Sequence, residues 1–411
     1  MDRIAENYVR LALAVGRHDP DFVDAYYGPP AWKEEAAARE RPLDELRSEA
    51  ETLLAELRAR PSDSGDELVR LRHQYLTRQL EAVRARIDML AGRRLSFDEE
   101  SRALYDAVAP RHGAEYFEGI LDRLETRVPG DGPLPERIDR FRQRFVIPLD
   151  RLEAVLHATA EECRRRTLEH VELPPGESFR IELVSGQPWA AYNWYQGNYR
   201  SRIQVNTSLP VFLDRAIDIG CHEGYPGHHV YNVLLEKHLV RERGWPELSI
   251  YLLFSPQSLI AEGTANFGIE VAFPGEERMR FERDRLCPLA GLDPDQIGRY
   301  AEVTALTRRL SYAWNEAARG YLDGFMSRAQ AIDFLVRWNL SSSLEAEHLL
   351  QFIERFRSYV INYNHGEDLV REHVESRGGT AENPARRWEV LGTLLTSPRL
   401  PAGLQVVGSP A

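Results

Sequence analysis

Two runs of helical pattern, residues 211–220 and 230–240, are joined by the sequence CHEGYPGHH at positions 221–229. The joining segment opens with a histidine–glutamate pair, His222 and Glu223, and closes with two histidines, His228 and His229. Imidazole nitrogens and carboxylate oxygens are common zinc ligands in proteins. The segment therefore predicts a metal site at the junction of two helices.

The spacing of these histidines departs from the HExxH pattern of zinc peptidases, in which two histidines stand one helical turn apart. On an unbroken helix, His222 and His228 would lie about 9 Å apart along the axis and be rotated by about 240°. They could not share an ion in that geometry. His222 and His229 would share a face but lie about 10.5 Å apart, which is again too far.

Pro226 changes this geometry because it has no N–H for the carbonyl of His222, and its ring clashes with that carbonyl. Gly227 is expected to take backbone angles closed to other residues. If both residues bulge out of the helix, the remaining residues read as HExxH, with His228 as the second histidine. The same operation leaves His229 one residue beyond the register. We therefore expect His228 to be the second ligand, with His229 as the alternative.

A third ligand is expected from the helical run SLIAEGTANF at 258–267. Glu262 is separated from His228 by 33 intervening residues and lies in a setting where an unpaired carboxylate would be costly. Asn266, one turn on, is placed to hydrogen-bond a histidine ligand, and Glu270, two turns on, to do likewise. Two neutral nitrogens and one carboxylate suit Zn²⁺ better than magnesium or calcium. The predicted ligands of one zinc ion per chain are His222, His228 and Glu262.

The glutamate of the motif is the expected general base. Glu223 would accept a proton from the metal-bound water and return it to the leaving amine. A tetrahedral oxyanion also needs a hydrogen-bond donor besides the metal. Tyr363, in the sequence NYNHG, is the first candidate for this donor, and Tyr359 and His365 are weaker ones.

Helical periodicity extends over most of the chain. Apolar residues recur at spacings of three and four through the first 170 residues and again from Pro210 to about Trp388. Ser96 with Glu99 three residues later is a capping box, which predicts a helix that runs through Val108. These patterns favour a mainly α fold.

A different pattern separates the two helical parts. Residues 179–184 and 202–206 alternate as half-buried strands do, which predicts a small antiparallel sheet beside the motif helix. We divide the chain into an N-terminal helical region, 1–172, and a zinc-site region, 173–411, that form one compact body.

Composition excludes several classes of protein. The 411 residues are 43% hydrophobic and 28% charged, enough to bury a large core, and no apolar stretch reaches the length of about 18 residues that a membrane span needs. The net charge of −12 argues against nucleic-acid and anionic-membrane partners. The N-terminus lacks the pattern of a signal peptide, and the three cysteines are too few for a disulfide framework. We expect a cytoplasmic protein whose cysteines are buried and reduced, and the sequence leaves its oligomeric state open.

The motifs resemble domain-of-unknown-function family 885, whose members carry HExxPGHH followed by an EGxA helix. The likeness extends to VDAYYGPP at 23–30 and to SYVINYNHGEDLVR at 358–371, so it spans most of the chain. That family is related to the gluzincin metallopeptidases, which hold zinc with two histidines and a glutamate. The resemblance implies a multi-helix metallopeptidase body with zinc at the floor of a deep cleft. Thr264 departs from the EGWA form of the helix at a supporting position.

The leading hypothesis is a zinc metallopeptidase that hydrolyses short peptides, since a walled cleft excludes folded proteins. Arg371 could pair with the terminal carboxylate of a peptide or, alternatively, with Glu367 on its own helix. Two other hypotheses remain open at this point. One is a metal-dependent hydrolase of non-peptide amides, and the other is a helical binding protein whose structural zinc takes a fourth ligand, for which His229 is the candidate.

Overall fold

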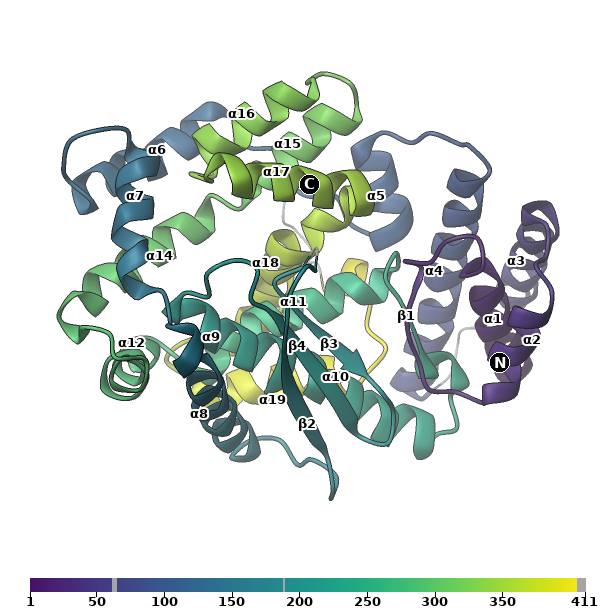
Figure 1. Cartoon of the computed structure of the whole chain (residues 1–411). Helices are drawn as coiled ribbons and strands as arrows, with labels where there is room; N and C mark the ends of the chain where they lie inside the picture. The colour runs from purple at the N-terminus through teal and green to yellow at the C-terminus, as the bar shows by residue number, and fades with distance from the viewer. Residues whose placement is uncertain (61–64, 188, 405–411) are drawn as a thin grey trace.

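In a computed structural model of the chain, which describes residues 1–60, 65–187 and 189–404, helices surround a small sheet (Figure 1). The predicted mainly α fold is confirmed. Hydrophobic side chains from α1 through α19 form one continuous core. No helix among these residues is long and apolar enough to cross a membrane.

Of the N-terminal helices, those within residues 2–105 lie at one end of the molecule, and those within residues 114–168 lie toward the opposite end (Figure 1). The predicted capping box is confirmed, because Ser96 and Glu99 exchange side-chain and backbone hydrogen bonds at the start of α5. This helix ends at Tyr105 and not at Val108, since Asp106 adopts a left-handed conformation with φ of 55°. The helices are α1 (Asp2–Val15), α2 (Pro30–Ala38), α3 (Leu43–Arg58), α4 (Glu67–Leu90), α5 (Phe97–Tyr105), α6 (Ala114–Arg127), α7 (Leu134–Arg142, followed by the 3₁₀ turn η1, Gln143–Phe145) and α8 (Leu149–Leu168).

The predicted small sheet is present as β2 (Ser178–Val184), β3 (Ala191–Tyr195) and β4 (Arg200–Asn206), in the order β2-β4-β3. Its two predicted strands are β2 and β4, and they pair in parallel, whereas only β3 and β4 are antiparallel. The difference arises because the aromatic segment between the predicted strands is itself a strand. It forms a hairpin with β4, which leaves the other edge of β4 for β2.

A second, two-stranded ribbon joins the two regions of the chain. β1 (Val23–Tyr26) pairs antiparallel with β5 (Ile250–Leu252), and the sequence patterns did not predict either strand. Side chains reinforce the junction, since Arg72 on α4 forms an ion pair with buried Glu247. The ribbon matters for the site because β5 leads directly into α11 (Pro256–Ala272).

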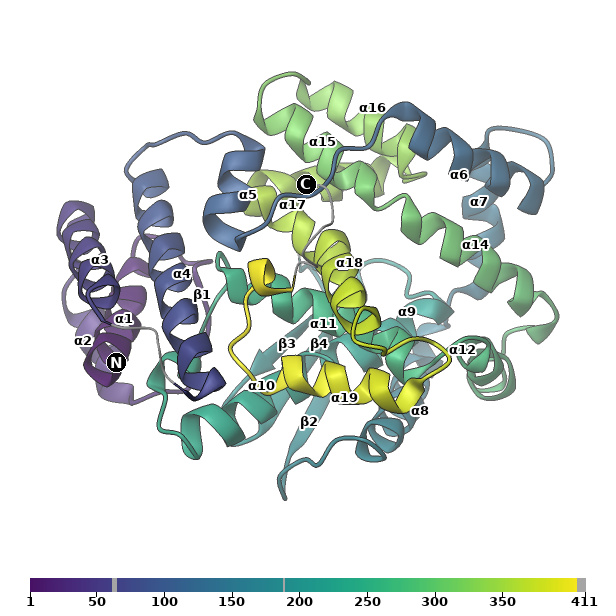
Figure 2. The same ribbon diagram turned by 180° about the vertical axis from the view of Figure 1, so that it is seen from behind.

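Helix α11 runs through the middle of the molecule and is buried along nearly its whole length. It packs closely against α18 (Ile361–Glu375), and this close packing requires glycine. A Cβ at Gly263 would overlap the carbonyl of Gly366 on the facing helix. Figure 2 shows α19 (Pro384–Leu395) across the back of the molecule, where it contacts both helices.

The remaining elements complete the helical shell. They are α9 (Leu213–Ile219), the π turn η2 (Gly220–Gly224), α10 (His228–Leu235), the π turn η3 (Glu236–Arg241), η4 (Pro246–Ser249), α12 (Glu277–Phe281), η5 (Glu282–Leu286), α13 (Cys287–Ala290), η6 (Pro294–Gln296), α14 (Ile297–Arg309), α15 (Tyr312–Leu322), α16 (Arg328–Trp338), α17 (Ser343–Phe356), η7 (Arg357–Val360) and η8 (Pro401–Gly403). All three cysteines are buried and free, as predicted.

Candidate metal centre

The motif breaks the helix more completely than a bulge would. Helix α9 continues into the π turn η2, after which Tyr225 is extended and the Tyr225–Pro226 peptide bond is cis. A new helix, α10, starts at His228. Two backbone hydrogen bonds fold the chain back on itself, from Tyr225 N to Gly220 O (3.0 Å) and from Gly227 N to Cys221 O (2.9 Å).

Gly227 has unusual backbone angles, as expected. Its φ of −76° and ψ of −134° belong to neither the α nor the β region. A Cβ at this position would overlap the carbonyl oxygen of His222. The close approach lets α10 begin directly beside the end of η2. As a result, the ring centroids of His222 and His228 lie 4.5 Å apart.

The structure brings His222, His228 and Glu262 together. Nε2 of His222 lies 3.2 Å from Oε2 of Glu262, and Nε2 of His228 lies 3.6 Å from Oε1. One potential ligand atom from each of the three residues falls within 4.8 Å of the others. The two imidazoles are 14% and 15% exposed, so solvent reaches them, whereas the carboxylate is only 7% exposed. We call these three residues the triad.

The donor atoms of the triad fit a zinc ion. Oε2 of Glu262 is buried and has no hydrogen-bond partner among the described residues, a costly state for a carboxylate oxygen unless a cation binds it. Two imidazole nitrogens and one carboxylate are a zinc-binding set that leaves a coordination position open. Glu262 also accepts a hydrogen bond from the hydroxyl of Tyr359 (2.7 Å), which fixes the carboxylate in place.

Asn266 orients the first histidine, as expected. Its Oδ1 lies 2.8 Å from Nδ1 of His222, which directs Nε2 of the ring toward Glu262. Its Nδ2 donates to the backbone carbonyl of Tyr363 (2.8 Å), so α18 holds the amide in turn. Glu270 does not share this role, because its carboxylate binds Arg371 and Arg387.

The pKa values of the three triad residues shift in different directions. Burial lowers the pKa of His228 to about 4. Burial also disfavours the charged form of His222, but the interaction with Glu262 and the charge of Glu223 raise its pKa to about 9. The pKa of Glu262 is lowered, since the two histidines outweigh the effect of its burial. The charge of Glu262 also raises the pKa of buried Glu223, and a bound cation would balance the charge of the two carboxylates.

Glu223 lies beside the triad without an ion-pair partner among the described residues. Its side chain is buried, and its backbone carbonyl accepts a hydrogen bond from Nδ2 of Asn193 on β3 (2.6 Å). Burial raises the pKa of Glu223 to about 7, against the opposing charge of His222. A carboxyl group that titrates near neutral pH is suited to take up and release a proton.

The three candidate oxyanion donors differ in the contacts of their side chains. The hydroxyl of Tyr359 is already committed to Glu262. The hydroxyl of Tyr363 makes no hydrogen bond to the described residues, and its pKa is raised by burial and then by the charges of Glu262 and Glu223. No described contact joins the ring of His365 to the triad, and burial lowers the pKa of this histidine to about 4.

His229 points away from the triad into a second cluster of polar residues. Its Nδ1 lies 2.8 Å from Oγ of Ser201, and its Nε2 lies 3.0 Å from Oε2 of Glu177. Glu177 also accepts hydrogen bonds from the hydroxyl of Tyr225 (2.6 Å) and from Arg164 (2.6 Å). Both nitrogens of His229 are therefore engaged, and the ring is fully buried. We call this cluster the Glu177 network; no sequence signal marked Glu177 or Ser201.

The side chain of Arg371 is also bound by other residues of the protein. Its guanidinium pairs with Glu270 and, at 2.6 Å, with Glu367 on its own helix, and it lies over the ring of Phe267. The intrahelical pair is the alternative that the sequence offered. Of the two alternatives, the structure therefore shows the ion pair with Glu367, and a second carboxylate of the protein, that of Glu270, also contacts Arg371.

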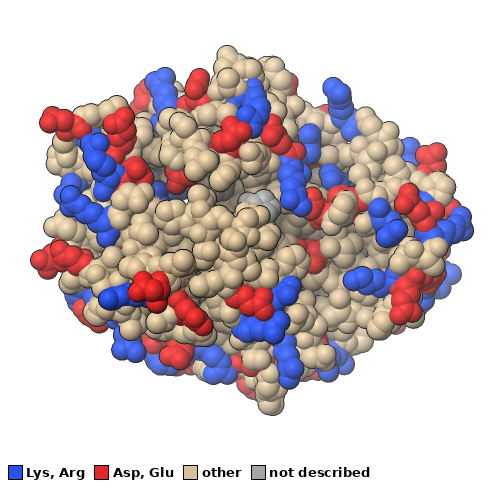
Figure 3. Space-filling model, viewed as in Figure 1, with Lys and Arg blue, Asp and Glu red and all other residues tan. Residues whose placement is uncertain are grey.

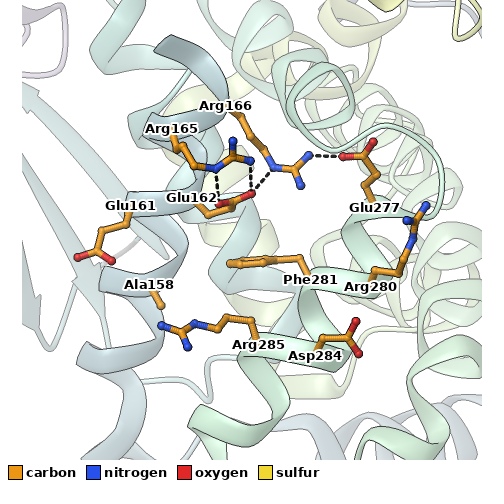
Figure 4. Close-up of a pocket in the computed structure, with 10 residues that line it drawn as sticks. All are labelled: Ala158, Glu161, Glu162, Arg165, Arg166, Glu277, Arg280, Phe281, Asp284 and Arg285. Atoms are coloured by element: carbon orange, nitrogen blue, oxygen red, sulfur yellow. Dashed lines mark hydrogen bonds and ion pairs between the residues drawn. The ribbon is translucent and has the colours of Figure 1, made fainter. Parts of the chain in front are cut away.

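The surface of the protein has a pocket that is separate from the triad. Figure 4 shows a pocket of about 650 Å³ between α8 and the α12–η5 segment, where Arg166 bridges Glu162 and Glu277. None of its lining residues belongs to the triad or its partners. On the face in Figure 3, the surface is hollowed between the three-stranded sheet and helices α15–α17, over α18.

Comparison with known proteins supports the fold. No family model and no curated protein matches the chain, so membership of family 885 is not confirmed. A Colwellia psychrerythraea protein provisionally classed as a lipoprotein has a TM-score of 0.56 at 13% identity, covering 93% of this chain and 79% of its own. This likeness shows a shared overall fold.

Two further structures are more distant. A lipoprotein-like protein of unknown function from Shewanella oneidensis has a TM-score of 0.44 at 14% identity, covering 89% of this chain and 76% of its own. The M32 carboxypeptidase of Deinococcus radiodurans has a TM-score of 0.41 at 13% identity, covering 98% of this chain and 93% of its own. Scores this low carry no argument about function.

Proposed function

We propose that the protein is a zinc-dependent peptidase that hydrolyses short peptides. The observation that carries the proposal is the convergence of His222, His228 and Glu262 beside an unpaired, buried Glu223. A zinc ion held by the triad would lower the pKa of a bound water toward about 7 and polarise the scissile carbonyl.

The protein's own residues supply the proton transfers. Glu223 accepts a proton from the attacking water and passes it to the leaving amine, a role for which a pKa of about 7 is suited. The free hydroxyl of Tyr363 donates a hydrogen bond to the developing oxyanion. Asn266 and Tyr359 hold His222 and Glu262 in position through their hydrogen bonds.

A structural zinc is the weaker alternative. A closed site needs a fourth protein ligand, and His229 was the candidate for it. Its two ring nitrogens face Ser201 and Glu177, so it has no nitrogen left for the ion. Among the described residues, no other histidine, cysteine or acid joins the triad within ligand distance. Hydrolysis of a non-peptide amide would use the same residues and is separated from peptide hydrolysis only by substrate.

The proposal is tested by digesting a synthetic library of short peptides with the zinc-loaded protein and reading the products by mass spectrometry. Cleavage that stops on adding a chelator and returns with zinc supports the proposal. Glu223→Gln serves as the matched control, because it is nearly isosteric and keeps the triad. Failure to cleave any peptide, with one zinc ion bound per chain, would contradict the proposed activity.

A further inference from the structure

Asp24 carries a carboxylate that has no cation to pair with it among the described residues. It lies on β1 where the register with β5 shifts, between Val23 and Ala25. Its Oδ1 accepts a hydrogen bond from the hydroxyl of Tyr192, and no described lysine, arginine or histidine forms an ion pair with it. The residue as a whole is partly exposed.

The neighbours of Asp24 are negative. Burial raises the pKa of Asp24 to about 8, and the charges of Glu262 and Glu223 contribute to the same shift. Tyr251, which pairs with Ala25 across the β1–β5 ribbon, also has its pKa raised by burial and then by Glu262 and Asp24. The carboxyl group of Asp24 therefore lies within the electrostatic reach of the triad. A positively charged ligand is the partner that this setting lacks.

A second acceptor beside the triad lacks a donor. Asn193 follows Tyr192 on β3 and is nine-tenths buried, and its Nδ2 is fixed by the carbonyl of Glu223. Its Oδ1 has no hydrogen-bond partner among the described residues. Buried acceptors without donors are costly, so this oxygen also points to a ligand that carries N–H groups.

We propose that Asp24 binds the free α-amino group of the peptide substrate, so that cleavage occurs near the amino end. The proposal rests on the peptidase activity inferred above and specifies which end of the peptide is recognised. An ammonium group supplies three N–H donors and the positive charge that Asp24 lacks. The opposite end has no comparable partner in Arg371, which is neutralised by Glu270 and Glu367.

The test uses matched peptides with the zinc-loaded, full-length protein. One pentapeptide is prepared with a free amine, with an acetylated amine, and with a free amine and a C-terminal amide. A fourth peptide has an acetylated amine and a lysine in second position, which separates an α-amino group from a lysine side chain. We expect kcat/KM for the free-amine peptide to exceed that for both acetylated peptides by about 10- to 100-fold, the range of one charge-assisted hydrogen bond. The C-terminal amide should change kcat/KM by less than about twofold.

Two variants test whether Asp24 causes the preference for a free α-amino group. Asp24→Asn should reduce the ratio of free-amine to acetylated kcat/KM to about one. Asp21→Asn is the matched control, because Asp21 belongs to the same segment and pairs with Arg355 outside the triad region. This control should keep the wild-type ratio. If Asp24→Asn fails to fold, the wild-type peptide comparison and calorimetric binding of the same peptides to Glu223→Gln still decide the matter.

The outcomes separate the inference from the proposed function. Equal cleavage of free-amine and acetylated peptides by the wild type overturns the role of Asp24 and leaves the peptidase intact. Preference for the acetylated lysine peptide overturns the assignment to the α-amino group. A ratio that Asp24→Asn does not change also overturns it. Failure to cleave every peptide overturns the proposed function and the inference together.

Discussion

His228 and His229 are consecutive residues in the first turn of α10, yet they belong to two different clusters. His228 faces Glu262 in the triad, where an acceptor lacks a partner. His229 faces Ser201 and Glu177, where every hydrogen bond of its ring is made. Burial lowers the pKa of both histidines, so burial does not distinguish them. Their partners across the fold, and not the residue type, decide what each one does.

The two glutamates of these clusters differ in the same way. Burial raises the pKa of Glu223 to about 7, since few groups stabilise its charge. Glu177 is also buried, but hydrogen bonds from His229, Tyr225 and Arg164 lower its pKa to about 2. A carboxylate with that many donors is held in its ionised form and is a poor proton carrier. The triad region is therefore suited to chemistry, and the Glu177 network to stability.

The largest effect should come from Glu223→Gln. We expect kcat to fall by about 10²- to 10⁴-fold, because the amide cannot take up the proton of the attacking water. The variant should keep one zinc ion per chain and its folding stability. Steady-state kinetics, elemental analysis and urea unfolding measure the three quantities. Loss of zinc together with activity would instead make Glu223 a ligand.

The corresponding change in the other cluster, Glu177→Gln, should have the opposite profile. Loss of the charged acceptor should lower the free energy of unfolding by about 3 kcal/mol, since charge-assisted hydrogen bonds to His229, Tyr225 and Arg164 weaken together. Zinc affinity should stay within about twofold of wild type. Urea titration and a competitive zinc assay test this pair of expectations. An unfolding free energy equal to that of wild type would remove the network's assigned role.

Lowering the pH should remove the stabilising contribution of the Glu177 network. Because the pKa of Glu177 is lowered from its ordinary value of 4.5 to about 2, its stabilising contribution is present above about pH 4.5. That contribution is lost as the pH falls toward 2, when the folded-state carboxylate takes up a proton. Wild type should therefore lose up to about 3 kcal/mol more than Glu177→Gln between pH 5 and 2. Parallel stability curves for the two proteins over this range would contradict the prediction.

Asn266→Ala should have the smallest effect, on zinc alone. The substitution removes the hydrogen bond that orients the ring of His222, so we expect zinc affinity to fall by about 10- to 100-fold. Thr264→Ala on the same helix is a matched control, since its hydroxyl bonds only backbone carbonyls of α11. Competition with a zinc chelator of known affinity measures both variants. Equal affinities would show that Asn266 does not orient the ligand.

Much of the triad could be predicted because its geometry is decided locally. Pro226 forces the helix to break within the motif, and only one of the two following histidines then returns to the face of His222. Asn266 follows from the same helical spacing that carries Glu262. The predicted helices and sheet also depend on local periodicity and capping, as at Ser96.

The remaining features depend on contacts between distant parts of the chain. Glu177 precedes β2 and contacts His229 only when the sheet packs on α10. The spacing of residues along the sequence therefore could not predict this contact. Asp24 is positioned by the pairing of β1 with β5, two strands too short for a clear pattern. The parallel pairing in the sheet was missed because β3 lies in a segment that the prediction assigned to a connection.

The central claim is that the triad uses His228 and excludes His229. It is tested most directly by measuring the zinc content of His228→Ala and His229→Ala by elemental analysis after loading and gel filtration. We predict that His228→Ala retains well under 0.1 zinc ions per chain, as three-ligand sites lose most of their affinity with one ligand. We predict that His229→Ala, though less stable, retains about one zinc ion per chain when it is folded. Retention by His228→Ala with loss by His229→Ala would contradict the account.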